Sequence, residues 1–247
     1  MNLLADEIVT CIKDQNFSKG YCLCEGFIKQ CELQFMEQLT IDTATDFVAA
    51  VLMFCQLAKL EKKPWRALLP LERIRGALRF MEDYIRSSEV YASSCYSVAS
   101  FYAGAAELGK ATYYFQKAAE FAEEKNTFLS AISDLFFYSF SSGKSLSEEV
   151  ISFAKSKLGE EAFCEILSLA EKESKDRIRT DPIEQSEEFS LIRYELEKEL
   201  DEILSQTDLN GRAFCLVYWE KKKELLQKKY GFPWKSPVEL NPTVQFQ

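Results

Sequence analysis

Residues that can stop a helix are scarce in this chain. Its 247 residues include only 9 glycines and 6 prolines. Sheet-rich folds need many turns built from these residues, so their scarcity favours long helices with short connections. Hydrophobic residues make up 47% of the chain, which is enough for a sizeable core and unlike a disordered protein. We therefore predict an all-α fold of antiparallel helical hairpins, in a short repeat-like solenoid or an irregular bundle.

Apolar residues at helical spacing, interrupted by breakers, predict where the helices lie. Thr43 or Thr45 is the expected N-cap of a helix that runs to Lys59, and Ser147 begins another. The stretch 172–188 is almost entirely polar, which indicates a domain boundary. We predict a helical-hairpin, repeat-like domain at 1–174, a polar linker at 175–188 and a C-terminal helical hairpin with a tail at 189–247.

The C-terminal region is expected to turn at Asn210-Gly211 and to end in an extended tail. Three prolines follow Gly231, and proline disfavours a helix both at its own position and just before it. Large apolar residues occur among them, at Phe232, Trp234 and Leu240. We therefore expect a non-helical tail that folds back and packs on the body of the protein.

The stretch from Cys95 to Ala118 places small and aromatic residues at the intervals that two closely packed helices need. Ala99 and Tyr102 share one helix, and the next carries Ala111, Phe115 and Ala118 at positions i, i+4 and i+7. This pattern, clear only for about residues 91–124, resembles a tetratricopeptide repeat, a family of helical hairpins stacked into interaction scaffolds. The resemblance implies a non-enzymatic protein-interaction module with a protein or peptide partner.

The resemblance also suggests where a partner would bind. The inner face of the first helix of the hairpin carries Ser93, Tyr96, Ser100 and Ala103. No basic or amide group occurs there, so a groove on this face would be neutral and aromatic and poorly suited to clamping a terminal carboxylate. The tail residues Phe232 and Trp234 are a second candidate contact surface.

The chain contains no histidine, which excludes several kinds of active site. Nucleophile systems that use a histidine base and zinc sites built on histidine cannot form. We expect no enzymatic activity and no cofactor. The alternative is a helical small-molecule-binding protein or enzyme that uses tyrosine, cysteine and carboxylate groups in an internal pocket. A deep, closed pocket lined by several tyrosines and a perturbed glutamate would favour it.

The formal charge is −9, from 30 basic and 39 acidic residues. Such a surface disfavours nucleic acids and anionic membranes as partners. No apolar run approaches the ~18 residues of a membrane span, and the N-terminus lacks the basic region of a signal peptide, so we expect a cytoplasmic protein.

The C-terminal helix is an exception to this acidity, because lysines alternate with aromatic residues there. They are Tyr218, Trp219, Lys221, Lys222, Lys223, Lys228, Lys229, Tyr230, Trp234 and Lys235. Weak nucleic-acid binding by this helix is a third hypothesis, although a helix with a charged outer face explains the pattern more simply. The run from Tyr218 to Pro242 resembles the tails of uncharacterised bacterial proteins.

The eight cysteines are expected to be free thiols, because a cytoplasmic protein is kept reduced. Cys22, Cys24 and Cys31, with Cys11 as a fourth ligand, are weak candidates for a zinc site. Structural zinc prefers two closely spaced cysteine pairs, and only one such pair is present. Buried free cysteines are therefore the favoured interpretation, with no metal.

Overall fold

The computed structural model describes residues 2–84, 89–205 and 211–245. These residues form helices and no strand, so the all-α prediction is confirmed. The chain divides into two compact units, Met1–Glu171 and Lys172–Gln247. Each unit has its own core.

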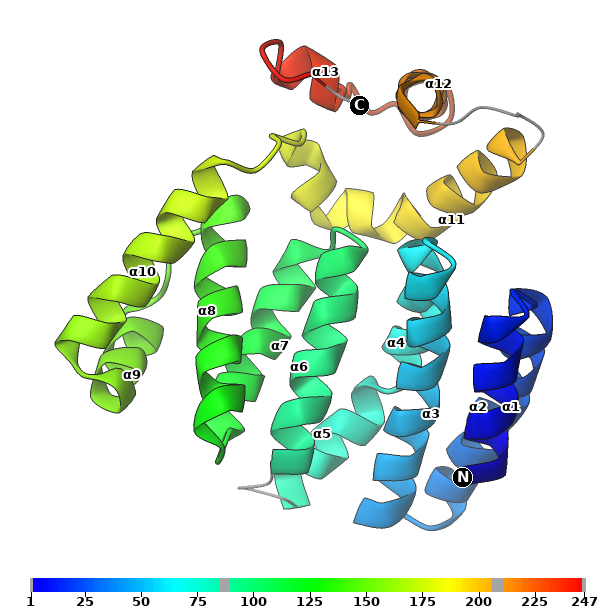
Figure 1. Ribbon diagram of the computed structural model, residues 1–247, viewed down its shortest axis with the longest axis vertical. Helices are drawn as coiled ribbons and strands as arrows, with labels where there is room; N and C mark the ends of the chain where they lie inside the picture. The colour runs from blue at the N-terminus through cyan, green and yellow to red at the C-terminus, as the bar shows by residue number, and fades with distance from the viewer. Residues whose placement is uncertain (1, 85–88, 206–210, 246–247) are drawn as a thin grey trace. The chain divides into compact units, whose positions relative to one another are not determined.

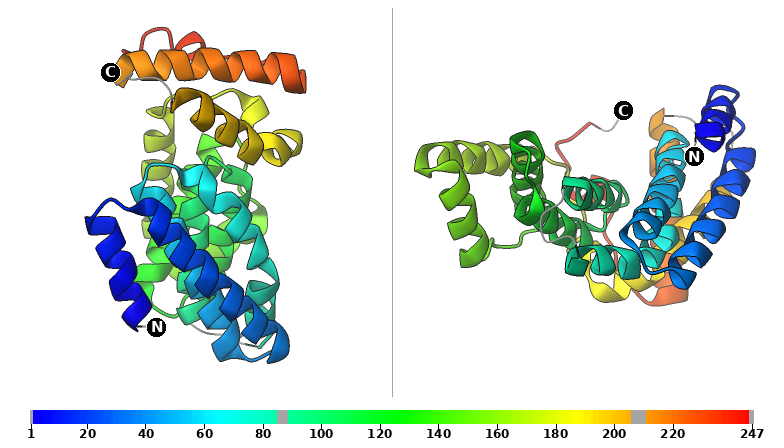
Figure 2. Two further views of the ribbon diagram at one scale, coloured as in Figure 1. Left: turned by 90° about the vertical axis from the view of Figure 1, so that its right-hand side faces the viewer. Right: turned by 90° about the horizontal axis from the view of Figure 1, so that it is seen from below.

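The N-terminal unit is a row of helices that lie side by side in the order of the chain (Figure 1). The elements are α1 (Asn2–Lys13), α2 (Phe17–Glu37), α3 (Ile41–Leu60), the 3-10 turn η1 (Pro64–Ala67), α4 (Leu68–Arg73), α5 (Arg75–Tyr84), α6 (Glu89–Gly104), α7 (Leu108–Phe121), α8 (Lys125–Ser141), α9 (Glu148–Leu158) and α10 (Glu160–Lys175), which continues across the division. The views in Figure 2 place α1 and α2 at one end of this row and α9 and α10 at the other.

Local sequence signals fix most of the helix ends. Ser147 caps α9, as predicted, and its hydroxyl accepts a hydrogen bond from the backbone N–H of Val150. The cap of α3 differs from the prediction, because Thr40 takes this position. Thr40 Oγ1 accepts from the backbone N–H of Thr43 at 3.2 Å, and Thr43 Oγ1 accepts in return from the N–H of Thr40. The reciprocal pair satisfies two helix-end donors, which a cap at Thr43 or Thr45 would leave open.

The hairpin of α6 and α7 packs through small side chains. Ala99 of α6 and both Ala111 and Ala118 of α7 are fully buried, and small residues allow two helix axes to approach closely. Tyr102 and Phe115, each 1% exposed, fill the space beside them. Consecutive helices of this unit thus pack in adjacent pairs.

One helix of the N-terminal unit passes a composition test for a membrane span. Among the described residues, α3 alone has sufficient length and hydropathy, and half of its most apolar stretch is buried inside the structure. A core helix of this kind passes the same test, since buried helices are apolar on most sides.

The C-terminal unit is built on two helices and a folded tail. Its elements are the 3-10 turn η2 (Pro182–Gln185), α11 (Glu187–Leu204), α12 (Gly211–Leu225), the π turn η3 (Leu226–Tyr230) and the single-turn helix α13 (Pro237–Leu240). The core of the unit contains Phe189, Leu196, Leu200, Leu226 and Trp234. Gly231 ends the π turn with a φ of +71°, a left-handed conformation that glycine adopts without steric strain.

Two sequence predictions need correction in this region. The stretch 175–188 is not only a linker, because it contains η2 and the buried Glu184. The tail is not wholly extended either, since Ser236 and Glu239 form a capping box that starts the short helix α13 with Pro237 in its first turn. The predicted turn at Asn210-Gly211 falls on 206–210, outside the described residues, and Gly211 begins α12.

Candidate functional site

An open cleft lies in the N-terminal unit, between α4 and α5 on one side and α6 and α7 on the other. Its volume is about 800 Å³, within the usual range for ligand sites. The described residues that line it are Glu72, Arg75, Gly76, Leu78, Arg79, Glu82, Asp83, Tyr91, Tyr102, Gly109, Lys110, Tyr113 and Tyr114. The lining combines tyrosines with charges of both signs.

A first polar cluster is centred on Glu72. Its Oε1 accepts from the hydroxyl of Tyr102 at 2.9 Å and from Nζ of Lys110 at 2.8 Å, and Oε2 accepts from Nη1 of Arg75 at 3.1 Å. Burial opposes ionisation of this carboxyl, but the hydrogen bonds from Lys110, Tyr102 and Arg75 and the charge of Lys110 together outweigh it and hold the pKa of Glu72 below its usual value. Glu72 is therefore ionised and has donors on both oxygens.

A second cluster repeats this arrangement with a carboxylate from α5 in place of the one from α4, again with partners on α6 and α7. Glu82 Oε1 accepts from Nζ of Lys117 at 2.8 Å, and Oε2 accepts from the hydroxyl of Tyr91 at 3.0 Å. Burial again opposes ionisation, while the bonds from Lys117 and Tyr91 lower the pKa of Glu82 on balance. Tyr91 is 1% exposed, so its phenol forms part of the floor of the cleft. The two clusters tie α4 and α5 to α6 and α7 and fix the width of the cleft.

Several groups on the cleft have no such partner. Arg79, Tyr113 and Tyr114 make no side-chain hydrogen bond or ion pair with any residue that the structure describes, and neither does the exposed Asp83. Tyr113 is 53% exposed and Tyr114 only 8%. Tyr114 stacks on Tyr102, with ring centroids 5.8 Å apart, which holds the phenol in place. The cleft therefore has a frame, formed by Glu72, Glu82 and their internal donors, and further lining groups whose hydrogen-bonding capacity is unused among the described residues.

The predicted contact face on α6 lies away from this cleft. At 100° per residue, Tyr96 and Ser100 are turned by about 140° and 180° from Tyr91. The Tyr96 hydroxyl donates to Oδ2 of Asp134 in α8 at 2.8 Å, and the Ser100 hydroxyl donates to the backbone carbonyl of Tyr96. Ser93 is exposed and Ala103 is buried. Tyr96 thus helps to join α6 to α8, and the four residues do not form one open surface.

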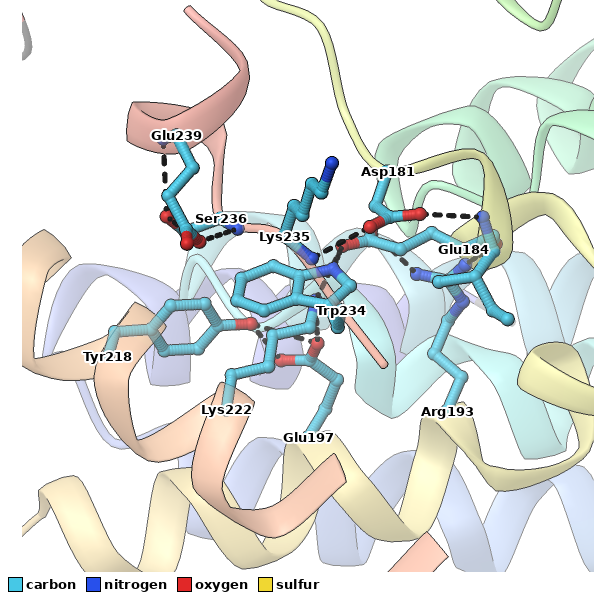
Figure 3. Close-up of polar contacts among 11 residues, drawn as sticks. Asp181, Glu184, Arg193, Glu197, Tyr218, Lys222, Trp234, Lys235, Ser236 and Glu239 are labelled. Carbon is cyan, nitrogen blue, oxygen red and sulfur yellow. Dashed lines mark hydrogen bonds and ion pairs between the residues drawn. The ribbon is translucent and has the colours of Figure 1, made fainter. Parts of the chain in front are cut away.

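The other predicted contact residues belong to the C-terminal unit, and Trp234 is not on its surface. Trp234 is 4% exposed and lies in the core, where Nε1 donates to Oε1 of Glu184 at 2.6 Å (Figure 3). Phe232 is partly buried and its ring lies 6.1 Å from that of Phe189. The tail packs onto the core of the C-terminal unit itself, and this packing removes Trp234 from the candidate contact residues.

Around Trp234 lies a cluster of buried charges (Figure 3). Lys222 Nζ lies 3.3 Å from Oε1 of Glu184 and 3.4 Å from Oε1 of Glu197, and Nη1 of Arg193 lies 3.9 Å from Oε2 of Glu184. The side chains of Glu184, Arg193 and Lys222 are each less than one tenth exposed. Two carboxylates face two cations, and the Tyr218 hydroxyl donates to both oxygens of Glu197. Burial and the Glu197 carboxylate raise the pKa of Tyr218 well above its usual value.

The tail is fastened across this cluster by further hydrogen bonds. The backbone N–H of Lys235 donates to Oδ2 of Asp181 at 2.7 Å, and Asn241 exchanges two hydrogen bonds with the backbone of Arg179. The cluster is closed and its members satisfy one another. We therefore assign it to the stability of the unit rather than to ligand binding.

The lysines of the C-terminal helix do not form an unpaired basic patch. Lys221 and Lys228 pair with Glu224, Lys223 with Glu239, and Lys229 with Glu199. Lys222 is enclosed in the buried cluster. Each of these cations has a carboxylate within the unit, which weakens the case for nucleic-acid binding by this helix.

The candidate zinc ligands are not assembled into a site. Cys22 is exposed, whereas Cys11, Cys24 and Cys31 are buried. Over the described part of the chain, no three or more cysteine, histidine or carboxylate side chains are grouped to hold a metal ion. Burial raises the pKa of Cys24 to about 12, so this thiol remains protonated and unsuited to metal binding at neutral pH.

The class that the fold defines is an all-helical protein with its helices packed in adjacent pairs. Neither the models of known protein families nor the curated proteins include a match to this chain. The chemistry of the cleft therefore carries the functional inference.

Proposed function

We propose that the protein is a non-enzymatic interaction module that binds a segment of a partner protein in the cleft that α4 and α5 form with α6 and α7. The observation that carries this proposal is the contrast within the cleft. Glu72 and Glu82 accept hydrogen bonds from internal donors on both carboxylate oxygens and form a fixed frame, while Arg79, Tyr113 and Tyr114 make no side-chain hydrogen bond or ion pair with the described residues. A preorganised frame with free donors is typical of a binding site.

Binding is favoured over catalysis by the composition of the cleft. Its described lining includes no serine, threonine, cysteine or histidine that could act as a nucleophile or as a base for one. The lowered pKa values of Glu72 and Glu82 leave these carboxylates ionised and weakly basic, opposite to the raised values that general acids need. Stacking of helices in adjacent pairs, as in the repeat family that the α6–α7 hairpin resembles, supports the same proposal.

Two glycines allow a test with a matched control. Gly76 lines the cleft, and a Cβ added there meets no atom within 4 Å. Gly26, in the exposed face of α2, is equally open but is not a lining residue. Gly76→Trp should fill part of the cleft without disturbing the core, and Gly26→Trp places the same bulk elsewhere. Circular dichroism would check that both variants keep the helical fold.

The experiment is a selection of random peptides, displayed on phage, against the full-length protein. The proposal predicts peptides that bind wild type and Gly26→Trp and that Gly76→Trp does not retain. Absence of any enriched peptide, or equal retention by the Gly76→Trp variant, would contradict the proposal.

A small molecule as ligand is the second candidate function. The cleft volume of about 800 Å³ and its four tyrosines are the observations that favour it. The cleft is open rather than closed, which is why we place this candidate second. Native mass spectrometry of the purified protein would support it by detecting a bound small molecule that Gly76→Trp lacks.

A further inference from the structure

We propose that the cleft recognises an acidic segment of its partner, with the guanidinium of Arg79 and the hydroxyls of Tyr113 and Tyr114 donating hydrogen bonds to a carboxylate. This inference rests on the proposed function and adds the chemical class of the ligand. It follows from which polar groups of the cleft already have hydrogen-bond partners within the protein.

The acceptors of the cleft are almost all in use. Glu72 receives bonds from Tyr102, Lys110 and Arg75, and Glu82 receives them from Tyr91 and Lys117. A basic ligand would have to displace these internal donors and leave buried phenols or a partly buried lysine without partners, which is unfavourable. Of the carboxylates in the described lining, the one that accepts no bond from a described residue is Asp83, an exposed side chain at the end of α5.

The unused groups are mainly donors. Tyr114 is more than nine-tenths buried, yet its hydroxyl has no partner among the described residues. That hydroxyl is not one of the fully enclosed polar atoms, and Tyr114 lines the cleft, so its accessible part opens there. Burial raises the pKa of Tyr114 to about 12, and the phenol therefore keeps its proton and can donate at neutral pH.

Arg75 supplies positive charge near this phenol, and Arg79 adds a second cation to the lining of the same cleft. Arg75 and Arg79 lie four residues apart on α5, so they share one face of the helix. Arg75 uses one N–H on Glu72, and its remaining donors are free to point to a ligand. Guanidinium groups bind carboxylates through paired hydrogen bonds, which makes this the anion that the site fits. Because the whole chain carries a charge of −9, an acidic segment gains nothing from the overall field and depends on these local donors.

The test uses the peptides selected on the wild-type protein, together with twins in which each Asp or Glu is replaced by Asn or Gln. Arg79→Gln removes the cation, and Lys29→Gln makes the same charge change at an exposed position of α2 outside the cleft. Tyr114→Phe removes only the hydroxyl, and Tyr84→Phe is its control on an exposed side chain. Affinities would be measured by fluorescence anisotropy.

The inference predicts that the selected peptides are enriched in Asp and Glu. Arg79→Gln and the amide twin should each weaken binding roughly ten- to a hundredfold, and Arg79→Gln should have little further effect on the twin, because both changes remove the same interaction. Tyr114→Phe should weaken binding roughly two- to tenfold. Both controls should bind as wild type.

Different results separate the two proposals. This inference is overturned, and the proposed function left intact, if the selected peptides require an open cleft but show no acidic enrichment. The same holds if they bind Arg79→Gln as tightly as wild type. A selection that yields no peptide overturns both. Displacement of an acidic peptide by inorganic phosphate at comparable concentration would assign the donors to a small anion and so contradict a protein segment as the ligand.

Discussion

Replacing Glu184 by glutamine tests whether the buried cluster of the C-terminal unit stabilises the fold. In wild type, Glu184 and Glu197 balance the charges of Arg193 and Lys222. The substitution preserves the shape of the side chain and leaves two buried cations with one carboxylate. Arg193 then loses its ion pair with Glu184, whose Oε2 lies 3.9 Å from Nη1.

Removing one partner of a buried ion pair typically destabilises a protein by about 3–5 kcal/mol, because the other charge remains buried. Two features favour the lower end of this range. Lys222 keeps Glu197 at 3.4 Å, and the amide oxygen of the new glutamine can still accept from Nε1 of Trp234. We therefore expect a loss of about 3 kcal/mol, which is roughly a hundredfold in the equilibrium constant for unfolding.

Urea unfolding of the full-length protein, followed by tryptophan fluorescence, measures this effect. Of the three tryptophans, Trp219 and Trp234 lie in the C-terminal unit, and a Trp65→Phe background confines the signal to that unit. The control is Glu195→Gln, the same change at an exposed position of α11, which should alter stability by less than about 0.5 kcal/mol.

A double variant makes the test independent of how stable the unit is. Adding Lys222→Met to Glu184→Gln leaves one cation, Arg193, with one carboxylate, Glu197, so the charges balance again. Neutral replacement of a buried pair is often tolerated, and we expect the double variant to be more stable than Glu184→Gln alone. The reasoning is refuted if Glu184→Gln has no more effect than Glu195→Gln, or if the second substitution adds its full destabilisation to the first.

Two further predictions concern the N-terminal unit. Its stability should fall as the pH rises from 10 to 12, because Tyr96 and Tyr114 keep their protons to about pH 12 in the folded state while unfolded tyrosines lose theirs near pH 10. Unfolding midpoints would be measured across this range, with tyrosinate absorbance as the monitor. Midpoints that stay constant would show the prediction to be wrong. Gly26→Ala should stabilise the protein by about 0.5–1 kcal/mol, because a helical glycine gains helix propensity and its new Cβ meets nothing. Gly20→Ala in the same helix should stabilise the protein less or destabilise it, since the new Cβ would lie 3.3 Å from Leu57. Thermal melts in which the two variants gain equal stability would contradict this packing argument.

Local sequence signals account well for the helices and poorly for the cleft. Ser147 was identifiable as a cap because its side chain bonds to a backbone group three residues away. The groups around the cleft gave a weaker signal. Glu72 and Glu82 lie on different helices, α4 and α5, so their spacing carries no information about a shared face. Lys110 and Lys117, seven residues apart on α7, do share one helical face. Such spacing also describes an ordinary solvated face, so it does not by itself indicate a site.

The sequence by itself determined that this chain is helical and where small residues allow its hairpins to close, as at Ala99 and Ala111, because helix propensity, breakers and spacing act over a few residues. Tertiary structure alone decided which polar groups meet. Tyr102 reaches Glu72 across 30 residues of chain, and Trp234 reaches Glu184 across 50. Those pairings depend on the register in which separate helices pack, and that register follows from the fit of many side chains at once.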